Sequence, residues 1–261
     1  MDYFDKAETW DRATLETVQL ARLKTTIQQA SRAPFYAKRL AEAGVSADNL
    51  RSLEDIRRIP FTSKDDLRSQ YPYGLATVPH SEFVRMHCSS GTTGTPVAVC
   101  YTQPDINSWA DLMARCLYMA GVRKDDVFQN MSGYGLFTGG LGIHFGAERL
   151  GCMTIPAGAG NSKRQLKLVK DFGTTVAHIL PSYALHLGTT LIEEGEDPKA
   201  LSLRIACVGA EPYTEETRRR IEALFDMKVY NSYGLSEMNG PGVAFECQYQ
   251  NGLHLWEDAY L

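Results

Sequence analysis

The sequence predicts an α/β fold in which βαβ units build a parallel sheet with helices on its faces, preceded by a helical N-terminal region. Three observations lead to this prediction. From about residue 125 on, short apolar runs alternate with helical stretches. The first 75 residues instead repeat apolar side chains at helical spacing. The 261 residues are 44% hydrophobic and 22% charged, as in ordinary globular proteins.

The helical region is assigned to residues 1–80. A helix over residues 35–43 should end at Gly44, which suits a left-handed C-cap. Ser52 and Ser63, each followed by acidic residues, should cap two short helices. Before Pro34, apolar spacing predicts a long helix whose inward face comprises Leu15, Val18, the stem of Arg22, Leu23, Ile27 and Ala30.

The α/β region is assigned to residues 81–261. Strands are predicted over residues 84–86, 97–101, 127–131, 153–155, 176–180, 204–208 and 228–232, with a hairpin of 243–245 and 253–256 around Asn251-Gly252. Helices are predicted over residues 139–150, 162–171, 182–194 and 214–225. Right-handed crossovers place the carboxyl ends of parallel strands at one edge, where such sheets bind ligands. The segments after those ends are therefore the first candidates for a site.

Composition narrows the class of protein. The 27 Lys+Arg and 31 Asp+Glu give a net charge of −4, which argues against a nucleic-acid partner. No apolar run approaches the roughly 18 residues of a membrane span, and the polar start does not resemble a signal peptide. The cysteines form no C-x-x-C pair, which indicates reduced thiols in a cytoplasmic protein: Cys88, Cys100, Cys116, Cys152, Cys207 and Cys247.

The strongest local signal is a loop rich in glycine and hydroxyl groups. Its glycines expose backbone N–H groups and its hydroxyls add donors, which is how a loop holds phosphate oxygens. It has neither the Gly-Lys-Ser/Thr ending of a Walker loop nor a G-x-G-x-x-G pattern. Composition alone leaves a polar hairpin tip as an equal alternative. The loop consists of Ser89, Ser90, Gly91, Thr92, Thr93, Gly94, Thr95 and Pro96.

Two further segments follow predicted strand ends. Residues 209–212 follow one strand, and residues 230–237 continue from the next. An aromatic ring beside a glycine turn can stack on a planar base, and a nearby carboxylate can hold Mg²⁺ bound to phosphates. Met238 stands where a G-x-S-x-G nucleophile elbow needs glycine, so that interpretation is rejected.

Residues 89–96, 209–212 and 233–237 resemble, in order and spacing, the motifs of the adenylate-forming enzymes. The wider text at residues 61–68, 134–142, 146–151 and 256–258 resembles the phenylacetate–CoA ligases. The likeness runs from about Leu20 to the end of the chain. It implies the N-terminal large domain of an adenylate-forming enzyme.

The resemblance implies that a carboxylate attacks the ATP α-phosphate to give an acyl-adenylate, from which CoA thiol displaces AMP. It gives the phosphates to the loop of Ser89, Ser90, Gly91, Thr92, Thr93 and Gly94, with Thr92 in the catalytic set. Ser236 would lie close to the α-phosphate, and Glu237 would coordinate Mg²⁺. The remaining nucleotide contacts would come from Gly209, Ala210, Glu211, Pro212, Asn231, Ser232, Tyr233 and Gly234.

An acid pocket is predicted after the strand over residues 127–131, where aromatic side chains beside three glycines can form an apolar slot. Core packing remains an equal alternative for Leu136 and Phe137. The predicted substrate contacts are Tyr134, Gly135, Phe137, Gly139 and Gly140. The implied partners are an aryl acid, ATP and CoA, and a homodimer stays open.

Cysteine and histidine residues give a separate, weaker prediction. Cys247 and His254 flank the Asn251-Gly252 turn and could form half of a structural zinc site, closed by residues remote in sequence. His144, His178 and His186 are interpreted as hydrogen-bonded core residues rather than ligands.

The sequence departs from the family in two ways. Thr95 and Val97 stand where many relatives carry a lysine. Relatives also continue past the position of Leu261 with a ribose-binding aspartate and a C-terminal lid domain that bears the adenylation lysine, so we expect a piece of a longer enzyme. Two alternatives remain: a module that binds ATP or acyl-adenylate without turnover, and an adenylation domain that serves a carrier protein. Phenylacetate cannot be told from related aryl acids at this stage.

Overall fold

The computed structural model describes residues 3–89 and 95–261, whose contacts divide the chain into two compact units. The helical unit comprises Asp5–Ile106 and Trp256–Leu261. The sheet unit comprises Asn107–Leu255 and, at the N-terminus, Tyr3 and Phe4. Each is described by itself below.

The helices predicted in the first 75 residues are present in the helical unit. Its elements are η1 (Lys6–Thr9), α1 (Arg12–Ala30), α2 (Pro34–Glu42), η2 (Ala47–Asn49), η3 (Leu53–Arg58), α3 (Lys64–Ser69) and η4 (His80–Glu82). Both predicted capping boxes form, at Ser52 with Asp55 and at Ser63 with Asp66. An antiparallel pair, β1 (Phe83–Cys88) and β2 (Ala98–Thr102), ends the unit's first segment.

The inward face of α1 differs from the prediction. Its buried residues are Leu15, Gln19, Leu23 and Ile27, in steps of four. Gln19 is buried because its side-chain amide donates to the Glu257 carbonyl oxygen at 2.7 Å. The predicted burial of the Arg22 stem is wrong: the side chain is 53% exposed and pairs with Asp258 at 3.1 Å. Spacing alone could not identify a polar residue whose partner lies over two hundred residues away.

The sheet unit is the predicted α/β fold. After α4 (Gln103–Met119), strands and helices alternate as β3 (Val127–Asn130), α5 (Thr138–Leu150), β4 (Met153–Ile155), α6 (Ser162–Phe172), β5 (Val176–Ile179), α7 (Pro181–Glu193), η5 (Pro198–Ala200), β6 (Ile205–Gly209), α8 (Glu215–Phe225) and β7 (Lys228–Leu235). The chain continues through η6 (Ser236–Met238), β8 (Gly240–Glu246) and β9 (Leu253–Leu255).

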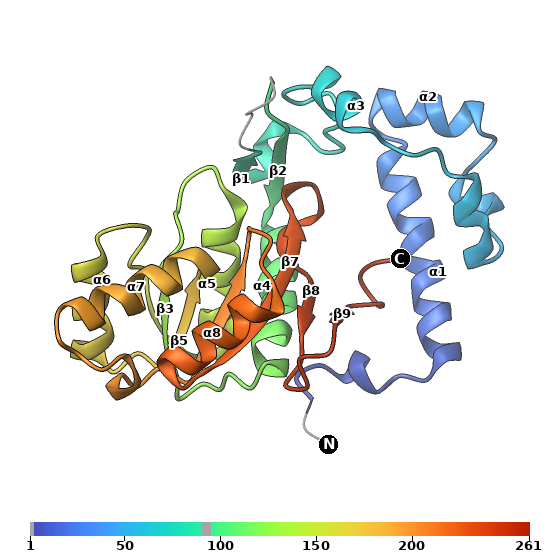
Figure 1. The fold of residues 1–261 in the computed structure, drawn as a ribbon. Coiled ribbons are helices and arrows are strands. Elements are labelled where there is room, and N and C mark those ends of the chain that lie inside the picture. The colour runs from blue at the N-terminus through green and yellow to red at the C-terminus, as the bar shows by residue number, and fades with distance from the viewer. Residues whose placement is uncertain (1–2, 90–94) are drawn as a thin grey trace. The chain divides into compact units, whose positions relative to one another are not determined.

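The seven strands lie in the order β4-β3-β5-β6-β7-β8-β9. Pairing is parallel from β4 to β7. The antiparallel pair of β8 and β9 is the predicted hairpin, and β8 also pairs antiparallel with β7. The sheet separates α4 and α5 from α6, α7 and α8 (Figure 1). The core between the sheet and the latter three helices includes Leu166, Leu187, Ile221, Ala177 and Val208.

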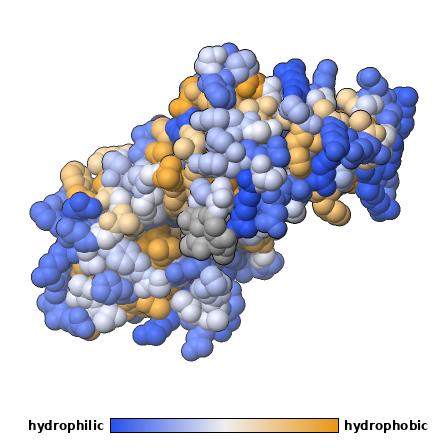
Figure 2. All heavy atoms as spheres, turned by 90° about the horizontal axis from the view of Figure 1, so that it is seen from above, coloured by the Kyte–Doolittle hydropathy of each residue, from blue (hydrophilic) through white to orange (hydrophobic). Residues whose placement is uncertain are grey.

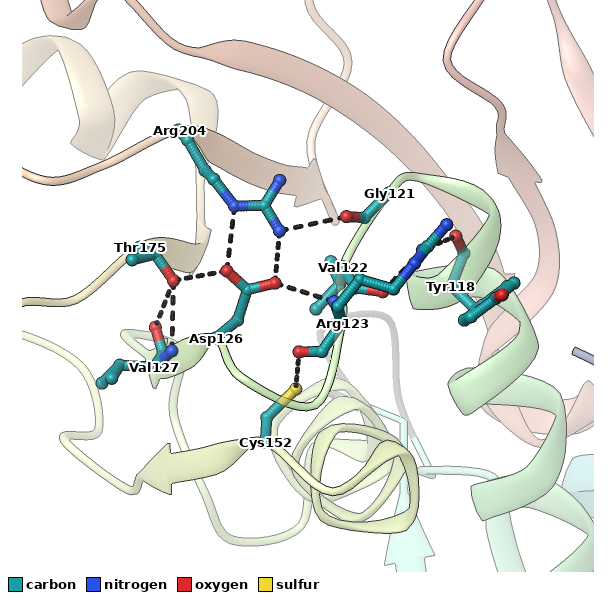
Figure 3. A network of polar contacts seen from close by, with 9 residues as sticks. All are labelled: Tyr118, Gly121, Val122, Arg123, Asp126, Val127, Cys152, Thr175 and Arg204. Atoms are coloured by element: carbon teal, nitrogen blue, oxygen red, sulfur yellow. Dashed lines mark hydrogen bonds and ion pairs between the residues drawn. The ribbon is translucent and has the colours of Figure 1, made fainter. Parts of the chain in front are cut away.

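The loop between α4 and β3, at the amino edge of the sheet, is held by backbone oxygens of its own residues and of the end of α4 (Figure 3). The Arg123 guanidinium donates to the carbonyls of Tyr118 and Val122, each at 2.8 Å, and lies 3.8 Å from the centre of the Tyr118 ring. Cys152, just before β4, donates its thiol to the Arg123 carbonyl at 3.3 Å. These contacts fix where β3 and β4 begin.

Exposed apolar side chains are scattered among hydrophilic ones on the face shown in Figure 2. Across residues 3–89 and 95–261, none of the helices combines the length and the apolar character needed to cross a bilayer.

Candidate functional site

A cavity of about 620 Å³ lies at the carboxyl edge of the parallel strands. Each of four neighbouring strands contributes residues just beyond its end: β3, β4, β5 and β6. This is where the predicted topology places a ligand site. The lining residues from these strand ends are Met131, Ser132, Gly133, Ala159, Gly160, Leu180 and Ala210, together with His178 in β5. The remaining walls of the cavity come from Phe137 and the first two turns of α7.

One wall of the cavity carries a buried polar network. The Nδ1 atom of His178 lies 2.9 Å from Asn130 Oδ1 and 3.1 Å from Ser132 Oγ. Ser132 donates its hydroxyl to the same Asn130 oxygen at 2.9 Å. Burial lowers the pKa of His178 to about 4, so the imidazole is neutral at pH 7. His178 is thus hydrogen-bonded, as predicted, but it also lines the cavity, which was not predicted.

The first turns of α7 form another part of the cavity lining. Tyr183 stacks on His186 with ring centres 5.8 Å apart, and Ser162 lies 3.2 Å from both the Tyr183 hydroxyl and His186 Nε2. The prediction that His186 is a core residue is wrong, because its side chain is exposed and lines the cavity. This part of the lining therefore combines an aromatic pair with two hydroxyl groups.

The segment after β6 approaches both the cavity and α7. Ala210 has a left-handed backbone, φ 66°, a conformation that is unfavourable for a residue with a Cβ atom. The Glu211 carboxylate accepts from the backbone N–H and the hydroxyl of Ser182, at 2.6 and 3.1 Å, and so caps the start of α7. A Cβ at Gly209 would lie 2.6 Å from the Ser232 carbonyl oxygen, so this position requires glycine.

The predicted acid-contact segment is only partly at the cavity. Phe137 lines the cavity and is 47% exposed, and Leu136 is 57% exposed, so neither packs in the core. The Tyr134 hydroxyl instead bonds with His144 Nδ1 at 3.0 Å. Cβ atoms at Gly139 and Gly140 would lie 2.3 Å from the Phe137 ring and 2.2 Å from the Gly133 oxygen. These two glycines thus allow close packing at the cavity wall.

Residues 231–237 occupy the end of β7 and the start of η6. Tyr233 is 51% exposed, which leaves its ring accessible. Ser236 lies with its hydroxyl 3.4 Å from that of Thr138. The Asn231 N–H donates to Glu246 at 2.7 Å, and a Cβ at Gly234 would meet the Gly240 oxygen at 1.9 Å. Their roles toward a nucleotide, like those of Ser232, Pro212 and Gly135, stay predictions.

The predicted phosphate loop is described only at its ends. Ser89 exchanges two hydrogen bonds with Val97 at 2.9 Å, one from its backbone N–H and one to its hydroxyl. The predictions for Ser90, Gly91, Thr92, Thr93 and Gly94 lie outside the described residues.

The predicted metal ligands are Cys247 and His254 for zinc and Glu237 for Mg²⁺. Within the described part of the chain, no three histidine, cysteine or acidic residues gather as a metal site would require, so zinc at Cys247 and His254 gains no support. Glu237 has no hydrogen-bond or ion-pair partner among the described residues, and Mg²⁺ at this carboxylate stays a prediction.

The residues that sequence reasoning missed are His178, Ser132, Ser182 and Tyr183. One signal was present: His178 is a polar residue near the carboxyl end of an otherwise apolar strand. Ser182 and Tyr183 follow that strand directly, where the topology predicts ligand contacts.

Comparison with known proteins adds the family context. The model of the AMP-binding enzymes matches residues 13–257. Phenylacetate–coenzyme A ligase from Pseudomonas putida is 47% identical over 258 residues, and that from Thermus thermophilus is 46% identical over 263. These matches cover 98% and 100% of this chain but only 59% of each relative.

A crystal structure of 2-hydroxyisobutyryl-CoA ligase, in complex with 2-HIB-AMP and CoA, superposes with a TM-score of 0.90 at 31% identity. It covers 97% of this chain and 56% of that protein. A benzoate–CoA ligase from Burkholderia xenovorans shares the fold alone, with a TM-score of 0.55 at 16% identity. The chain thus spans a little over half the length of the two phenylacetate–coenzyme A ligases and of the 2-hydroxyisobutyryl-CoA ligase.

Proposed function

The chain belongs to the AMP-binding enzyme family, and from that premise we propose that it is the ATP- and acid-binding part of an AMP-forming acid–CoA ligase. In this reaction a carboxylate oxygen attacks the α-phosphorus of ATP, and the bond to pyrophosphate breaks. The sulfur of CoA then attacks the acyl carbon of the adenylate, and AMP leaves. The acid is proposed to be an arylacetic acid.

The observation that carries the proposal is the cavity at the carboxyl edge of the sheet. Its volume falls within the range of small-molecule sites, and most of its lining is apolar. Met131, Phe137, Leu180 and Tyr183 supply surfaces suited to a flat ring. An aryl group in this cavity would thus be desolvated on several sides. The similarity to phenylacetate–coenzyme A ligases supports the same class of acid.

The chemistry demands little of the side chains. A carboxylate is already a nucleophile, so the protein must mainly position two substrates and neutralise phosphate charge. We assign the phosphates to residues 89–94, with Mg²⁺ at Glu237 and adenine against Tyr233. A homodimer and a cytoplasmic location stay predictions of the sequence.

The nucleotide assignment is tested at Glu237. Binding of Mg²⁺-ATP, measured by calorimetry, should weaken at least about tenfold in Glu237→Gln, because one charged metal ligand becomes neutral. Glu216→Gln, an exposed carboxylate on α8, is the matched control and should bind as the parent does. Unchanged affinity in Glu237→Gln would remove this residue from the site.

The acid assignment is tested with non-hydrolysable acyl-adenylate analogues, in which a sulfamate replaces the phosphate. Analogues that carry phenylacetyl or benzoyl groups should bind more tightly than long-chain aliphatic ones. A preference for long aliphatic chains would contradict the aryl proposal. Failure of every analogue to bind would contradict the proposed function itself.

A further inference from the structure

We infer that the cavity selects acids that carry a hydrogen-bond donor on the ring, and that His178 Nε2 accepts from this donor. The inference rests on the proposed function, because it treats the cavity as the site of the acid's organic group. It narrows the substrate class from arylacetic acids in general to those with a ring hydroxyl, a ring amino group or an indole N–H.

The neutral His178 imidazole carries its one ring N–H proton on Nδ1. The Asn130 amide nitrogen donates to the Gly140 carbonyl at 2.7 Å, which turns the amide oxygen toward His178. That oxygen carries no hydrogen, so the contact at 2.9 Å requires an N–H on His178 Nδ1. Because the buried ring is neutral, its other nitrogen, Nε2, holds a lone pair and no proton.

The lone pair of His178 Nε2 faces the cavity. His178 is 92% buried, with 8% of its surface exposed, and it lines the cavity. Both polar contacts of its ring are made by Nδ1, to Asn130 and to Ser132. Nε2 has no hydrogen-bond partner among the described residues, and it keeps some solvent-accessible surface. The accessible part of the ring therefore opens into the cavity.

The cavity lining around His178 Nε2 offers a second acceptor and apolar side chains. Ser132 also lines the cavity, and its hydroxyl proton is directed to Asn130, so it presents lone pairs as well. The neighbouring lining from Met131, Leu180 and Ala210 offers apolar side chains. A ring without a donor would displace water from His178 Nε2 and leave this acceptor unpaired. Sites built to pair with a substrate group discriminate strongly against analogues that lack it.

The test compares hydroxyl and methyl groups, which are similar in size, on one scaffold. Phenylacetyl sulfamoyl-adenosines bearing either group at the ortho, meta or para position are titrated into the protein by calorimetry. At one ring position, the hydroxyl compound should bind about tenfold to a hundredfold more tightly than its methyl partner. The indoleacetyl analogue should bind more tightly than its N-methylated form.

Substitution of His178 supplies the second arm. In His178→Leu the hydroxyl preference should disappear, and in His178→Gln, which retains an acceptor oxygen, part of it should return. The ratio of two affinities measured on one sample is independent of the fraction folded, so a loss of stability does not imitate the result.

The outcomes separate the two proposals. Equal binding of hydroxyl and methyl analogues at every position, or an unchanged preference in His178→Leu, would overturn the inference and leave the proposed function intact. No binding of any analogue would overturn the proposed function and this inference with it.

Discussion

Asp126 and Arg204 form a two-point ion pair at the amino edge of the sheet, opposite the cavity (Figure 3). Arg204 Nε lies 2.9 Å from Asp126 Oδ1, and Nη2 contacts Oδ2. Asp126 precedes β3 and Arg204 precedes β6, while Thr175, which precedes β5, donates to Asp126 at 2.7 Å. Because β5 lies between β3 and β6, one carboxylate joins the starts of three neighbouring strands.

Replacement of this carboxylate should destabilise the protein. Asp126→Asn removes the charge that Arg204 pairs with, and the free energy of unfolding should fall by about 1–3 kcal/mol. Urea unfolding at pH 7 measures the loss. The matched control is Asp125→Asn, whose side chain is exposed and next in sequence, and which should unfold like the parent. Equal stability of the two variants would contradict the role of Asp126.

The same pair predicts a dependence on pH. Burial of Asp126 opposes its ionisation, but hydrogen bonds from Arg204, the Arg123 N–H and Thr175 outweigh burial and lower its pKa. The stabilisation is therefore complete above the unfolded-state pKa of about 3.9 and is lost as pH falls through the lower folded-state value. The stability difference between the parent and Asp126→Asn should shrink below about pH 4. A difference that grows on acidification would contradict this sign.

A buried pair joins α8 to β8. The Arg218 and Glu246 side chains are 6% and 4% exposed, and their two contacts measure 2.7 and 2.8 Å. Glu246→Leu should cost about 3–5 kcal/mol in the free energy of unfolding, because it leaves a buried guanidinium without its main partner. The double variant with Arg218→Met should recover part of this loss. A double-mutant cycle by urea unfolding measures the coupling energy between Arg218 and Glu246. Strictly additive losses of the free energy of unfolding would show that the two side chains are not coupled.

Two glycines of α5 should respond differently to alanine. At Gly146 a Cβ would lie 2.3 Å from Met113 Cβ, which cannot swing away, so Gly146→Ala should cost about 1–3 kcal/mol. At Gly139 the Cβ would meet the outer atoms of the half-exposed Phe137 ring, which can turn. Gly139→Ala should therefore change the affinity for acyl-adenylate analogues more than the unfolding temperature. Equal destabilisation by both would contradict this difference.

The capping carboxylate of α7 links stability to the cavity. Glu211→Ala removes both acceptors from Ser182, which should lower the free energy of unfolding by about 1 kcal/mol. Because Ser182 lines the cavity, analogue affinity should also fall. Glu193→Ala, at the other end of α7, is the control; it removes a negative charge from a helix C-terminus and should not destabilise. Retained stability and affinity in Glu211→Ala would contradict the cap.

Much of the fold could be predicted because each strand is short, apolar and bounded by turn residues. Apart from one strand end, the five parallel strands begin and end within one residue of their predicted bounds. The exception is the end of β7, which runs through Tyr233 and Gly234 to Leu235. A glycine after an aromatic residue is typical of a turn. Here Gly234 instead continues the strand, because it pairs with Pro241 of β8 next to a shift in the strand register.

The site was harder to predict, because the edge of the sheet could be located but not the side chains that turn toward it. The sequence favours Tyr134 over Phe137 as a contact to the acid, whereas in the structure Phe137 lines the cavity and the Tyr134 hydroxyl bonds with His144. That choice depends on the packing of α5, which spacing along one segment does not contain. His178 is buried and hydrogen-bonded, as predicted, but the pattern of one strand could not reveal the cavity that opens beside it.

The two edges of the sheet have consequences for how such a protein can change. Among the described residues, the lining of the cavity includes none of the side chains that join the strand starts at the amino edge, which are Asp126, Thr175 and Arg204. Mutations that reshape the pocket at His178 or Phe137 can thus accumulate without loosening the strand order. A scaffold of this kind is therefore evolvable at its carboxyl edge, because the contacts that join three strand starts at the amino edge stay intact when the cavity lining changes.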